Sequence, residues 1–177
     1  MKEFETRIIK IDIEDVKSRL KSMHASKVKM ENQINKIYDF PDNRLIRQKG
    51  YARIRIVDNL MNNSNEYYMT TKKLISQDTY KIMEENEILI SDEKAGEKIF
   101  KSLGLELKQS IKKYRESYKY KNSLVEIDIN DKSFCPFPYI EIETKSNQEL
   151  REIVGFLGYT LEDTTSDTIY DIMRKER

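Results

Sequence analysis

Apolar and charged residues alternate along most of this chain, and the alternation predicts its strands. Side chains of a strand point to opposite faces in turn, so a period of two indicates a sheet with one apolar and one polar face. This pattern predicts strands at residues 3–8, 37–40, 51–57, 66–74, 81–90, 107–120, 124–129 and 139–145. Most of them follow one another directly, which favours a largely antiparallel sheet. Residues 44–50 lack the pattern and are expected to form a loop or the lead-in to a hairpin.

Four segments instead place apolar residues three and four positions apart, as amphipathic helices do. These predicted helices span residues 12–23, 92–103, 147–157 and 166–175. The first three have expected N-caps, which are Asp12, Asp92 and Asn147. Gly104 and Gly158 come after the second and third helices, where a glycine commonly ends a helix.

The first predicted strand carries Glu3, Glu5 and Arg7 on one face. Taken alone, this strand is most simply explained by a polar face of an antiparallel sheet that is exposed to solvent. The same design recurs in other strands, in which charged residues share a face: Arg53 and Arg55; Lys72; Glu85 and Glu87; Lys113 and Arg115; Glu126 and Asp128; Glu141 and Glu143. One such pair could be a cross-strand ion pair worth ~0.2–1 kcal/mol. Its repetition over most strands favours an enclosed charged surface.

The amphipathic helices need an apolar surface to cover, and the apolar face of the sheet is the obvious one. The charged face then lies on the inside, and a barrel of about eight strands can hold a small ligand there. We therefore predict an α+β fold, a closed eight-stranded antiparallel β-barrel or tunnel with a charged interior and helices packed outside. The length of 177 residues suits a single domain over residues 1–177.

Composition excludes several classes of function. Lys and Arg number 32 against 31 Asp and Glu, so a net charge of +1 gives no overall attraction for nucleic acid or an anionic membrane. The chain has no membrane-length apolar run and no signal peptide. The single cysteine, Cys135, rules out an intrachain disulfide and favours the cytoplasm. With one histidine, His24, and no glycine-rich phosphate loop, any bound phosphate must be held by side chains.

The charged faces themselves suggest a ligand. The basic residues are too numerous for one carboxylate and fit a polyphosphate chain: Arg7, Arg53, Arg55, Lys72, Lys113 and Arg115. Carboxylates at this density cannot all stay ionised without compensation, since like charges raise one another's pKa. A hard cation such as Mg²⁺ or Mn²⁺ would compensate them, because both prefer oxygen ligands.

Seven motifs in the same order resemble those of a known family. Glu3-Phe4-Glu5-Thr6-Arg7 resembles its ExExK signature, although Arg7 stands in place of the lysine. The other six are Tyr38-Asp39, Ala52-Arg53-Ile54-Arg55, Met69-Thr70-Thr71-Lys72, Glu85 with Glu87, Lys113-Tyr114-Arg115 and Tyr139-Ile140-Glu141-Ile142-Glu143. The chain thus resembles the CYTH superfamily, the triphosphate tunnel metalloenzymes. The stretch from Leu157 to Tyr170 is similar to its class IV adenylate cyclase-like branch.

The resemblance implies roles for these residues. The six basic residues above would bind the triphosphate. The implied catalytic residues are Glu3, Glu5, Glu85 and Glu87, and the implied metal ligands are Glu3, Glu5, Asp128, Glu141 and Glu143. The site aspartate stays open between two residues. Asp131 fits the usual spacing before the last motif, whereas Asp128 fits the strand alternation and is slightly preferred, because a loop can lengthen freely.

Three functions remain in competition. Hydrolysis of inorganic triphosphate or an organic triphosphate asks for the fewest features and is preferred, with Mg²⁺ or Mn²⁺ as cofactor. Cyclisation of ATP to cyclic AMP and pyrophosphate would use the same tunnel but also needs an adenine pocket. A non-catalytic binder of polyphosphate or nucleotide would leave the acidic residues unexplained. The expected partner is a small-molecule triphosphate, not nucleic acid or a membrane, and a homodimer is one option for the oligomeric state.

Overall fold

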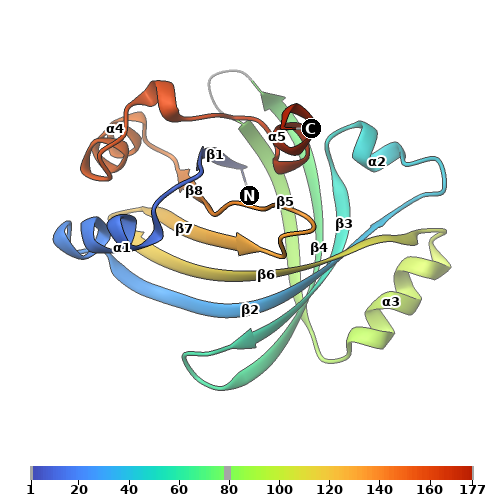
Figure 1. Cartoon of the computed structure of the whole chain (residues 1–177). Helices are drawn as coiled ribbons and strands as arrows, with labels where there is room; N and C mark the ends of the chain where they lie inside the picture. The colour runs from blue at the N-terminus through green and yellow to red at the C-terminus, as the bar shows by residue number, and fades with distance from the viewer. Residues whose placement is uncertain (1, 78–80, 177) are drawn as a thin grey trace.

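The computed structural model describes the backbone of residues 2–77 and 81–176, with side chains for residues 5–77 and 82–176. Eight strands make one sheet: β1 (Lys2–Ile9), β2 (Ser26–Asp39), β3 (Tyr51–Asn59), β4 (Ser64–Gln77), β5 (Lys81–Ile90), β6 (Glu106–Tyr120), β7 (Ser123–Asn130) and β8 (Tyr139–Thr144). The helices are α1 (Ile13–Ser22), α2 (Arg44–Arg47), α3 (Glu93–Ser102), α4 (Asn147–Phe156), the short 3₁₀ helix η1 (Leu161–Asp163) and α5 (Ile169–Lys175) (Figure 1).

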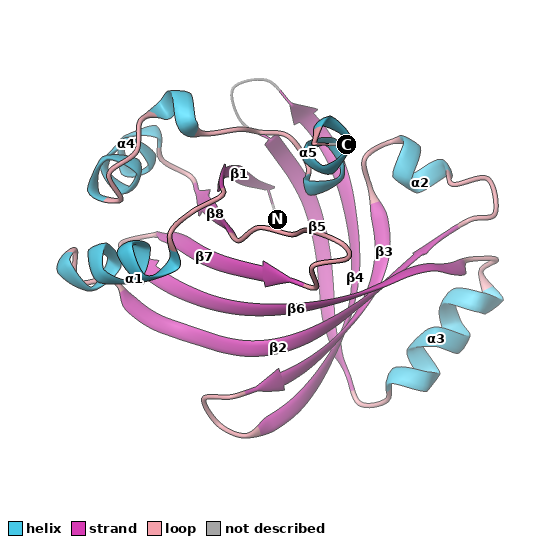
Figure 2. Ribbon diagram, viewed as in Figure 1, coloured by secondary structure: helices cyan, strands magenta, loops and turns pink. Residues whose placement is uncertain are grey.

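The strands pair antiparallel in the order β1-β5-β4-β3-β2-β6-β7-β8. The predicted α+β class with eight antiparallel strands is confirmed. Among the described residues, β1 pairs with β8 over six residue pairs but with β5 over only four, from Glu5 and Lys81 to Lys2 and Glu84. Within this part of the chain the strands therefore join into a ring only through this short seam, and the predicted closed barrel needs correction. Along most of its length the sheet is a strongly curled half-barrel, as Figure 2 shows.

Helices cover the outer, apolar face of the sheet in two places. Val16 and Leu20 of α1 and Ile153 of α4 pack with Val125 of β7 and Ile142 of β8 in one fully buried cluster. A second, smaller cluster lies elsewhere on the same outer face and joins α3 to β2 and β3 through Phe100, Tyr38 and Ile54. Apolar burial of this kind stabilises the curled sheet from outside and leaves its inner face to polar residues.

Several helix ends follow the predicted chemistry. The carboxylate of Asp12 accepts a hydrogen bond from the backbone of Asp15, and that of Asp92 accepts two in the first turn of α3. Gly104 and Gly158 follow α3 and α4 with φ of +88° and +80°, a conformation that favours glycine. The N-cap of α4 is Ser146 rather than the predicted Asn147, because the Ser146 hydroxyl accepts from the Glu149 amide at 3.2 Å.

Two predicted elements near the middle of the chain need correction. β2 begins at Ser26, eleven residues before the predicted start at Ile37, and pairs with β3 and β6 along its length. Polar inward residues such as Gln33 alternate there with Val28, Met30 and Ile34, but Asn32 interrupts the apolar positions, which weakens the pattern. The segment 44–50 contains the one-turn helix α2, whose first amides donate to the Asp39 carboxylate at 2.8–3.0 Å.

The end of the chain returns to the sheet. The backbone of Thr165 exchanges two hydrogen bonds with Arg7 of β1, at 2.8 and 2.9 Å. α5 follows and lies over one end of the curled sheet, on its inner side (Figure 1). No described helix combines the length and apolar character that crossing a membrane requires.

Candidate functional site

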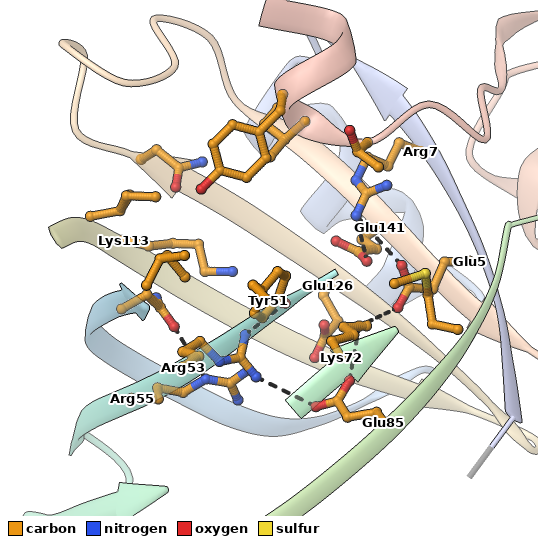
Figure 3. Close-up of a pocket in the computed structure, with 18 of the residues that line it drawn as sticks. Glu5, Arg7, Tyr51, Arg53, Arg55, Lys72, Glu85, Lys113, Glu126 and Glu141 are labelled. Atoms are coloured by element: carbon orange, nitrogen blue, oxygen red, sulfur yellow. Dashed lines mark hydrogen bonds and ion pairs between the residues drawn. The ribbon is translucent and has the colours of Figure 1, made fainter. Parts of the chain in front are cut away.

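The curled sheet encloses a cavity of about 340 Å³. All eight strands contribute to its wall, together with α2, α5 and the loop between β7 and β8. Cavities of roughly 300–1,000 Å³ hold small-molecule ligands in other proteins. Figure 3 shows the charged side chains that point into the cavity from opposite walls.

The six basic residues that the sequence singled out all line this cavity. Each of their side chains is between 8% and 12% exposed, so they are largely withdrawn from water: Arg7 of β1, Arg53 and Arg55 of β3, Lys72 of β4, and Lys113 and Arg115 of β6. The Nε atoms of Arg7 and Arg53 are buried without a hydrogen-bond acceptor among the described residues. Buried donors lacking acceptors are costly, and an anionic ligand would satisfy them.

Three carboxylates gather where β1 meets β8. Glu5 lies opposite Glu143 and Arg7 lies opposite Glu141 in the strand register. One oxygen each of Glu5, Glu141 and Glu143 lies within 4.8 Å of the others. An all-oxygen donor set of this kind matches the preferences of Mg²⁺ and Mn²⁺. The side chain of Glu3, also a predicted ligand and catalytic residue, lies outside the described residues.

The basic side chains of Arg7 and Lys72 contact this acidic cluster. Arg7 Nη2 donates to Glu141 Oε1 at 2.8 Å, and Lys72 Nζ contacts Glu5 Oε1 directly. Burial lowers the pKa of Lys72, but Glu5 and the neighbouring Tyr51 and Glu85 outweigh it and raise that pKa well above its ordinary value. Arg7 and Lys72 therefore compensate part of the negative charge of the cluster, and all three of its carboxylates line the cavity.

Glu85 and Glu87 of β5, the strand next to β1, form a second acidic group that shares Lys72 with the first. Glu85 lies 2.9 Å from Lys72 Nζ, and Arg53 Nη2 lies 3.4 Å from Glu85 and 3.3 Å from Glu87. Burial raises the pKa of Glu85, but Lys72 and Arg53 outweigh it and lower the pKa to about 2. Glu85 is thus ionised at neutral pH, where it orients Lys72 and Arg53.

The geometry separates the two candidate aspartates. Asp128 is fully buried, and its two oxygens accept from Arg115 Nε at 2.6 Å, Arg115 Nη2 at 2.7 Å and Lys113 Nζ at 3.0 Å. Asp131 is exposed in the following loop, where it accepts hydrogen bonds from Ser133. Asp128 therefore holds two of the cavity's basic residues. It stands outside the group of three carboxylates within 4.8 Å, although the sequence grouped it with them as a metal ligand.

Lys113 and Arg55 have lowered pKa values, whereas those of the other four basic residues are raised. Burial and the nearby charge of Arg115 lower the pKa of Lys113 to about 8, although Asp128 opposes the shift. Burial and Arg53 likewise lower the pKa of Arg55. Both shifts reflect cations that crowd one another, which is the situation that a multiply charged anion relieves.

Glu126 and Asn35 are among the cavity residues that were missing from the predicted site. Glu126 is 2% exposed, contacts Arg115 Nη1, and accepts from Ser117 Oγ at 2.8 Å. It shares the alternation of β7 with Asp128, so the sequence carried the signal. Asn35 accepts from Arg55 Nε at 3.3 Å. Asn35 is neutral and lies before residue 37, where this strand was predicted to begin, so the sequence did not mark it as a site residue.

The structure is a curled antiparallel sheet whose cavity is lined by basic and acidic side chains. A family model described as the CYTH domain matches residues 1–164, and the chain belongs to this family. The predicted family is thereby confirmed. No curated protein sequence matches the chain.

Solved structures agree with this fold. The PH1012 protein of Pyrococcus horikoshii has a TM-score of 0.76 at 23% identity, over 96% of this chain and 98% of that one. A candidate adenylate cyclase from Vibrio parahaemolyticus has a TM-score of 0.74 at 14% identity, covering 97% of each chain. HpAC1 from Hippeastrum, a candidate adenylyl cyclase described as having a dominant triphosphatase activity, has a TM-score of 0.70 at 16% identity, over 99% of this chain and 96% of that one. At these identities the likeness establishes the fold alone.

Proposed function

We propose that this chain is a divalent-metal-dependent enzyme that binds a triphosphate in its cavity and hydrolyses it. The observation that carries the proposal is the presence of six largely buried basic side chains and two groups of carboxylates within one cavity. Basic residues alone would suffice for a phosphate binder. The additional cluster of Glu5, Glu141 and Glu143 supports a cation and hence catalysis.

Each charged group has a role in this proposal. The triphosphate lies along Arg7, Arg53, Arg55, Lys72, Lys113 and Arg115, which neutralise its charge and orient the terminal phosphorus. Asp128 and Glu85 orient these bases through the ion pairs described above. Glu5, Glu141 and Glu143, together with Glu3, would hold Mg²⁺ or Mn²⁺, whose charge supplies further neutralisation of phosphate oxygens.

The proposed reaction is attack of water on the terminal phosphorus. The new bond joins the water oxygen to phosphorus, and the bond to the bridging oxygen breaks, so that phosphate and a diphosphate leave. Glu3, Glu5, Glu85 and Glu87 are the carboxylates proposed to orient the water and receive its proton. Positioning and charge neutralisation supply most of the acceleration in such reactions.

Two other functions remain as alternatives. The similarity in fold to proteins named as candidate adenylate cyclases keeps cyclisation of ATP to cyclic AMP and pyrophosphate as the second candidate. A non-catalytic binder of polyphosphate or nucleotide is the third. Under the leading proposal, a small-molecule triphosphate in the cytoplasm is the substrate, no nucleic acid or membrane takes part, and the enzyme is a monomer or homodimer.

A substrate panel separates these functions. The purified chain is incubated with tripolyphosphate, thiamine triphosphate or ATP, with Mg²⁺ or with Mn²⁺. Phosphate release supports the hydrolase, and cyclic AMP with pyrophosphate from ATP supports the cyclase. Absence of turnover with every substrate and both metals would contradict catalysis and favour the binder.

An isosteric substitution tests the acidic cluster. Glu5→Gln keeps the shape of the side chain but removes its charge, and we expect kcat to fall on the order of 10²-fold. Glu152→Gln on α4, whose side chain pairs with Lys121 at the surface, is the matched control and leaves the rate unchanged. Equal activity of the Glu5→Gln variant and the wild type would contradict the proposed role of the cluster.

A further inference from the structure

The inner face of β2 carries three polar side chains beside the basic residues of the cavity. Glu31, Gln33 and Asn35 alternate along the strand, so they share one face, and they are 6%, 2% and 6% exposed. Asn35 lies directly opposite Arg55 in the β2–β3 register and lines the cavity. Glu31 and Gln33 are not among the residues that line it, so a ligand in the cavity would not touch them.

Hydrogen bonds connect these three side chains to Arg55 in one row. Gln33 Nε2 donates to Glu31 Oε2 at 2.7 Å, and Asn35 Nδ2 donates to Gln33 Oε1 at 3.3 Å. Arg55 Nε in turn donates to Asn35 Oδ1 at 3.3 Å. We call Glu31, Gln33 and Asn35 the β2 relay. Each of its two amides directs the NH₂ group towards Glu31 and the oxygen towards Arg55.

The two ends of the row fix the direction of both amides. A carboxylate can only accept hydrogen bonds, whereas a guanidinium can only donate them. Gln33 must therefore offer its NH₂ group to Glu31, and Asn35 must offer its oxygen to Arg55. Turning either amide round would put two acceptors or two donors against each other. The carboxylate of Glu31 thus determines which atom of Asn35 faces Arg55.

Arg55 is oriented differently from the other basic residues of the cavity. Each of the other five has a side-chain nitrogen within 3.3 Å of a carboxylate oxygen: Arg7, Arg53, Lys72, Lys113 and Arg115. Arg55 Nη1 lies 4.0 Å from Glu87, so the hydrogen bond to Asn35 is the shorter contact. A neutral amide orients the guanidinium without cancelling its charge. The positive charge of Arg55 is therefore left for an anionic ligand.

A fixed Nε also fixes the rest of the Arg55 guanidinium. The group is planar, so the position of Nε sets the directions in which Nη1 and Nη2 donate. Donors that already point towards a ligand bind it without reorganisation. The Arg55 side chain is 11% exposed and lines the cavity, where its terminal nitrogens can donate to a phosphate oxygen.

We propose that Glu31 is a positioning residue, which acts through Gln33 and Asn35 to hold Arg55 in the orientation that binds a phosphate group. The inference rests on the proposed function and extends its binding site to residues that the ligand does not touch. A general electrostatic role would have the opposite sign, because less negative charge near the cavity strengthens anion binding. Without the carboxylate of Glu31, by contrast, Asn35 can turn its NH₂ group towards Arg55 and binding weakens.

Binding of tripolyphosphate to the full-length chain tests the relay, measured by isothermal titration calorimetry with EDTA present to prevent turnover. Glu31→Gln and Gln33→Met each break the row of hydrogen bonds, the second without a change in charge. Both should raise the Kd about tenfold. Unchanged or tighter binding by either variant would overturn the inference. If one variant fails to fold, the other still decides the question.

Glu66→Gln is the matched control. Glu66 shares a face of β4 with Lys72, and it accepts hydrogen bonds from Tyr68, Asn59 and Ser64 rather than from the relay. Its substitution also removes one negative charge, but binding should stay the same or become slightly tighter. A tenfold loss in this variant as well would show that the effect is not specific to the relay and would overturn the inference.

A double-mutant cycle identifies Arg55 as the target. Arg55→Lys removes Nε, so Glu31→Gln should cause no further weakening in that background. A tenfold loss that persists there would act through another residue, such as Arg115, which lies opposite Glu31 in the β2–β6 register. That result would overturn the role assigned to Arg55.

The protein without ligand provides a second measurement. Exchange of the Arg55 Nε proton with water, followed by nuclear magnetic resonance, should become several-fold faster in Glu31→Gln and in Gln33→Met. The reason is that the oxygen of Asn35 is no longer held towards Arg55. Equal exchange in the wild type and both variants would overturn the relay.

The two proposals fail separately. Wild-type protein that hydrolyses tripolyphosphate, with the same KM in Gln33→Met, would support hydrolysis and overturn the relay. Wild-type protein that hydrolyses no triphosphate with Mg²⁺ or Mn²⁺, while both relay variants bind tripolyphosphate more weakly and exchange faster, would overturn hydrolysis and support the relay.

Discussion

Arg7 and Glu141 lie opposite each other in the β1–β8 register, and Arg7 Nη2 donates to Glu141 Oε1 at 2.8 Å. The same guanidinium donates through Nη1 to the backbone carbonyl of Asp167 at 2.9 Å. Burial lowers the pKa of Arg7, but Glu141 and Glu5 outweigh it and raise the pKa, so the charge persists. One side chain thus connects the acidic cluster to the segment that leads into α5.

Arg7→Lys tests this double contact. Lysine keeps the charge, but its single ammonium group cannot reproduce both ends of the guanidinium fork. We expect a loss of about 1–3 kcal/mol in the free energy of unfolding, measured by urea titration, because a charge-assisted hydrogen bond disappears. Tripolyphosphate should also bind several-fold more weakly. Arg151→Lys, on the exposed side of α4, is the control. A lysine variant that matches the wild type in both measurements would show that one contact is sufficient.

Glu141→Gln tests the cation site directly. The variant keeps one oxygen ligand but removes a charge from the group that Glu141 forms with Glu5 and Glu143. Mn²⁺ binding, followed by electron paramagnetic resonance of the free ion, should weaken on the order of tenfold or more, since carboxylate charge dominates affinity for hard cations. The Glu152→Gln control should bind Mn²⁺ as the wild type does. Equal Mn²⁺ affinity in all three proteins would place the cation elsewhere.

Lys113 should make triphosphate binding depend on pH. Its pKa of about 8 lies below the ordinary value for lysine, so in the free protein it loses its proton as pH rises through 8. A bound anion raises this pKa again. Affinity should therefore decline above pH 8, and binding at pH 8 should take up about half a proton. Calorimetry in buffers of different ionisation enthalpy measures this uptake. It should vanish in Lys113→Met, and proton uptake that persists in that variant would assign it to another group.

Glu116 offers a stability test outside the cavity. It is 2% exposed on the outer side of β6, lies 2.8 Å from the ammonium groups of Lys17 and Lys27, and accepts from the hydroxyls of Tyr114 and Tyr118. Burial raises its pKa, but these partners outweigh it and lower the pKa to about 2.

The sign of its pH dependence follows from that shift. A carboxyl with a lowered folded-state pKa contributes stability above its ordinary pKa of about 4.5, and the contribution disappears as pH falls towards 2. Glu116→Gln should cost about 1–3 kcal/mol of unfolding free energy at pH 7 and progressively less below pH 4. Triphosphate binding at pH 7 should be unaffected, because Glu116 faces away from the cavity. A loss of stability that stays constant from pH 7 to pH 2 would show that the charge of Glu116 does not matter.

Most of the site residues that could be predicted from the sequence were identified by the alternation of charged and apolar residues. Arg53 and Arg55, like Glu85 and Glu87, are two residues apart in strands, so they must share a face whatever surrounds them. Ile54, the apolar residue between Arg53 and Arg55, had to face the helices, which indicated the sense in which the sheet curls around its charged face. These site residues could be predicted because the members of each pair are close in sequence and lie in one strand. The strand β2 was underestimated because Asn32 and Lys36 interrupt the apolar positions of its outer face, whereas its cross-strand hydrogen bonds continue past them.

The sequence by itself therefore determined the sheet, the faces of its strands and the family. Only the tertiary structure decided that Asp128 rather than Asp131 meets Arg115, that Arg7 reaches Asp167, and that Phe134 and Tyr170 meet at one end of the cavity. Two of these contacts join residues more than 30 positions apart, and the third depends on where β7 ends and its loop turns outward. Local periodicity contains no information about such distances, because they are set by how the sheet curls and how the C-terminal segment packs back onto β1.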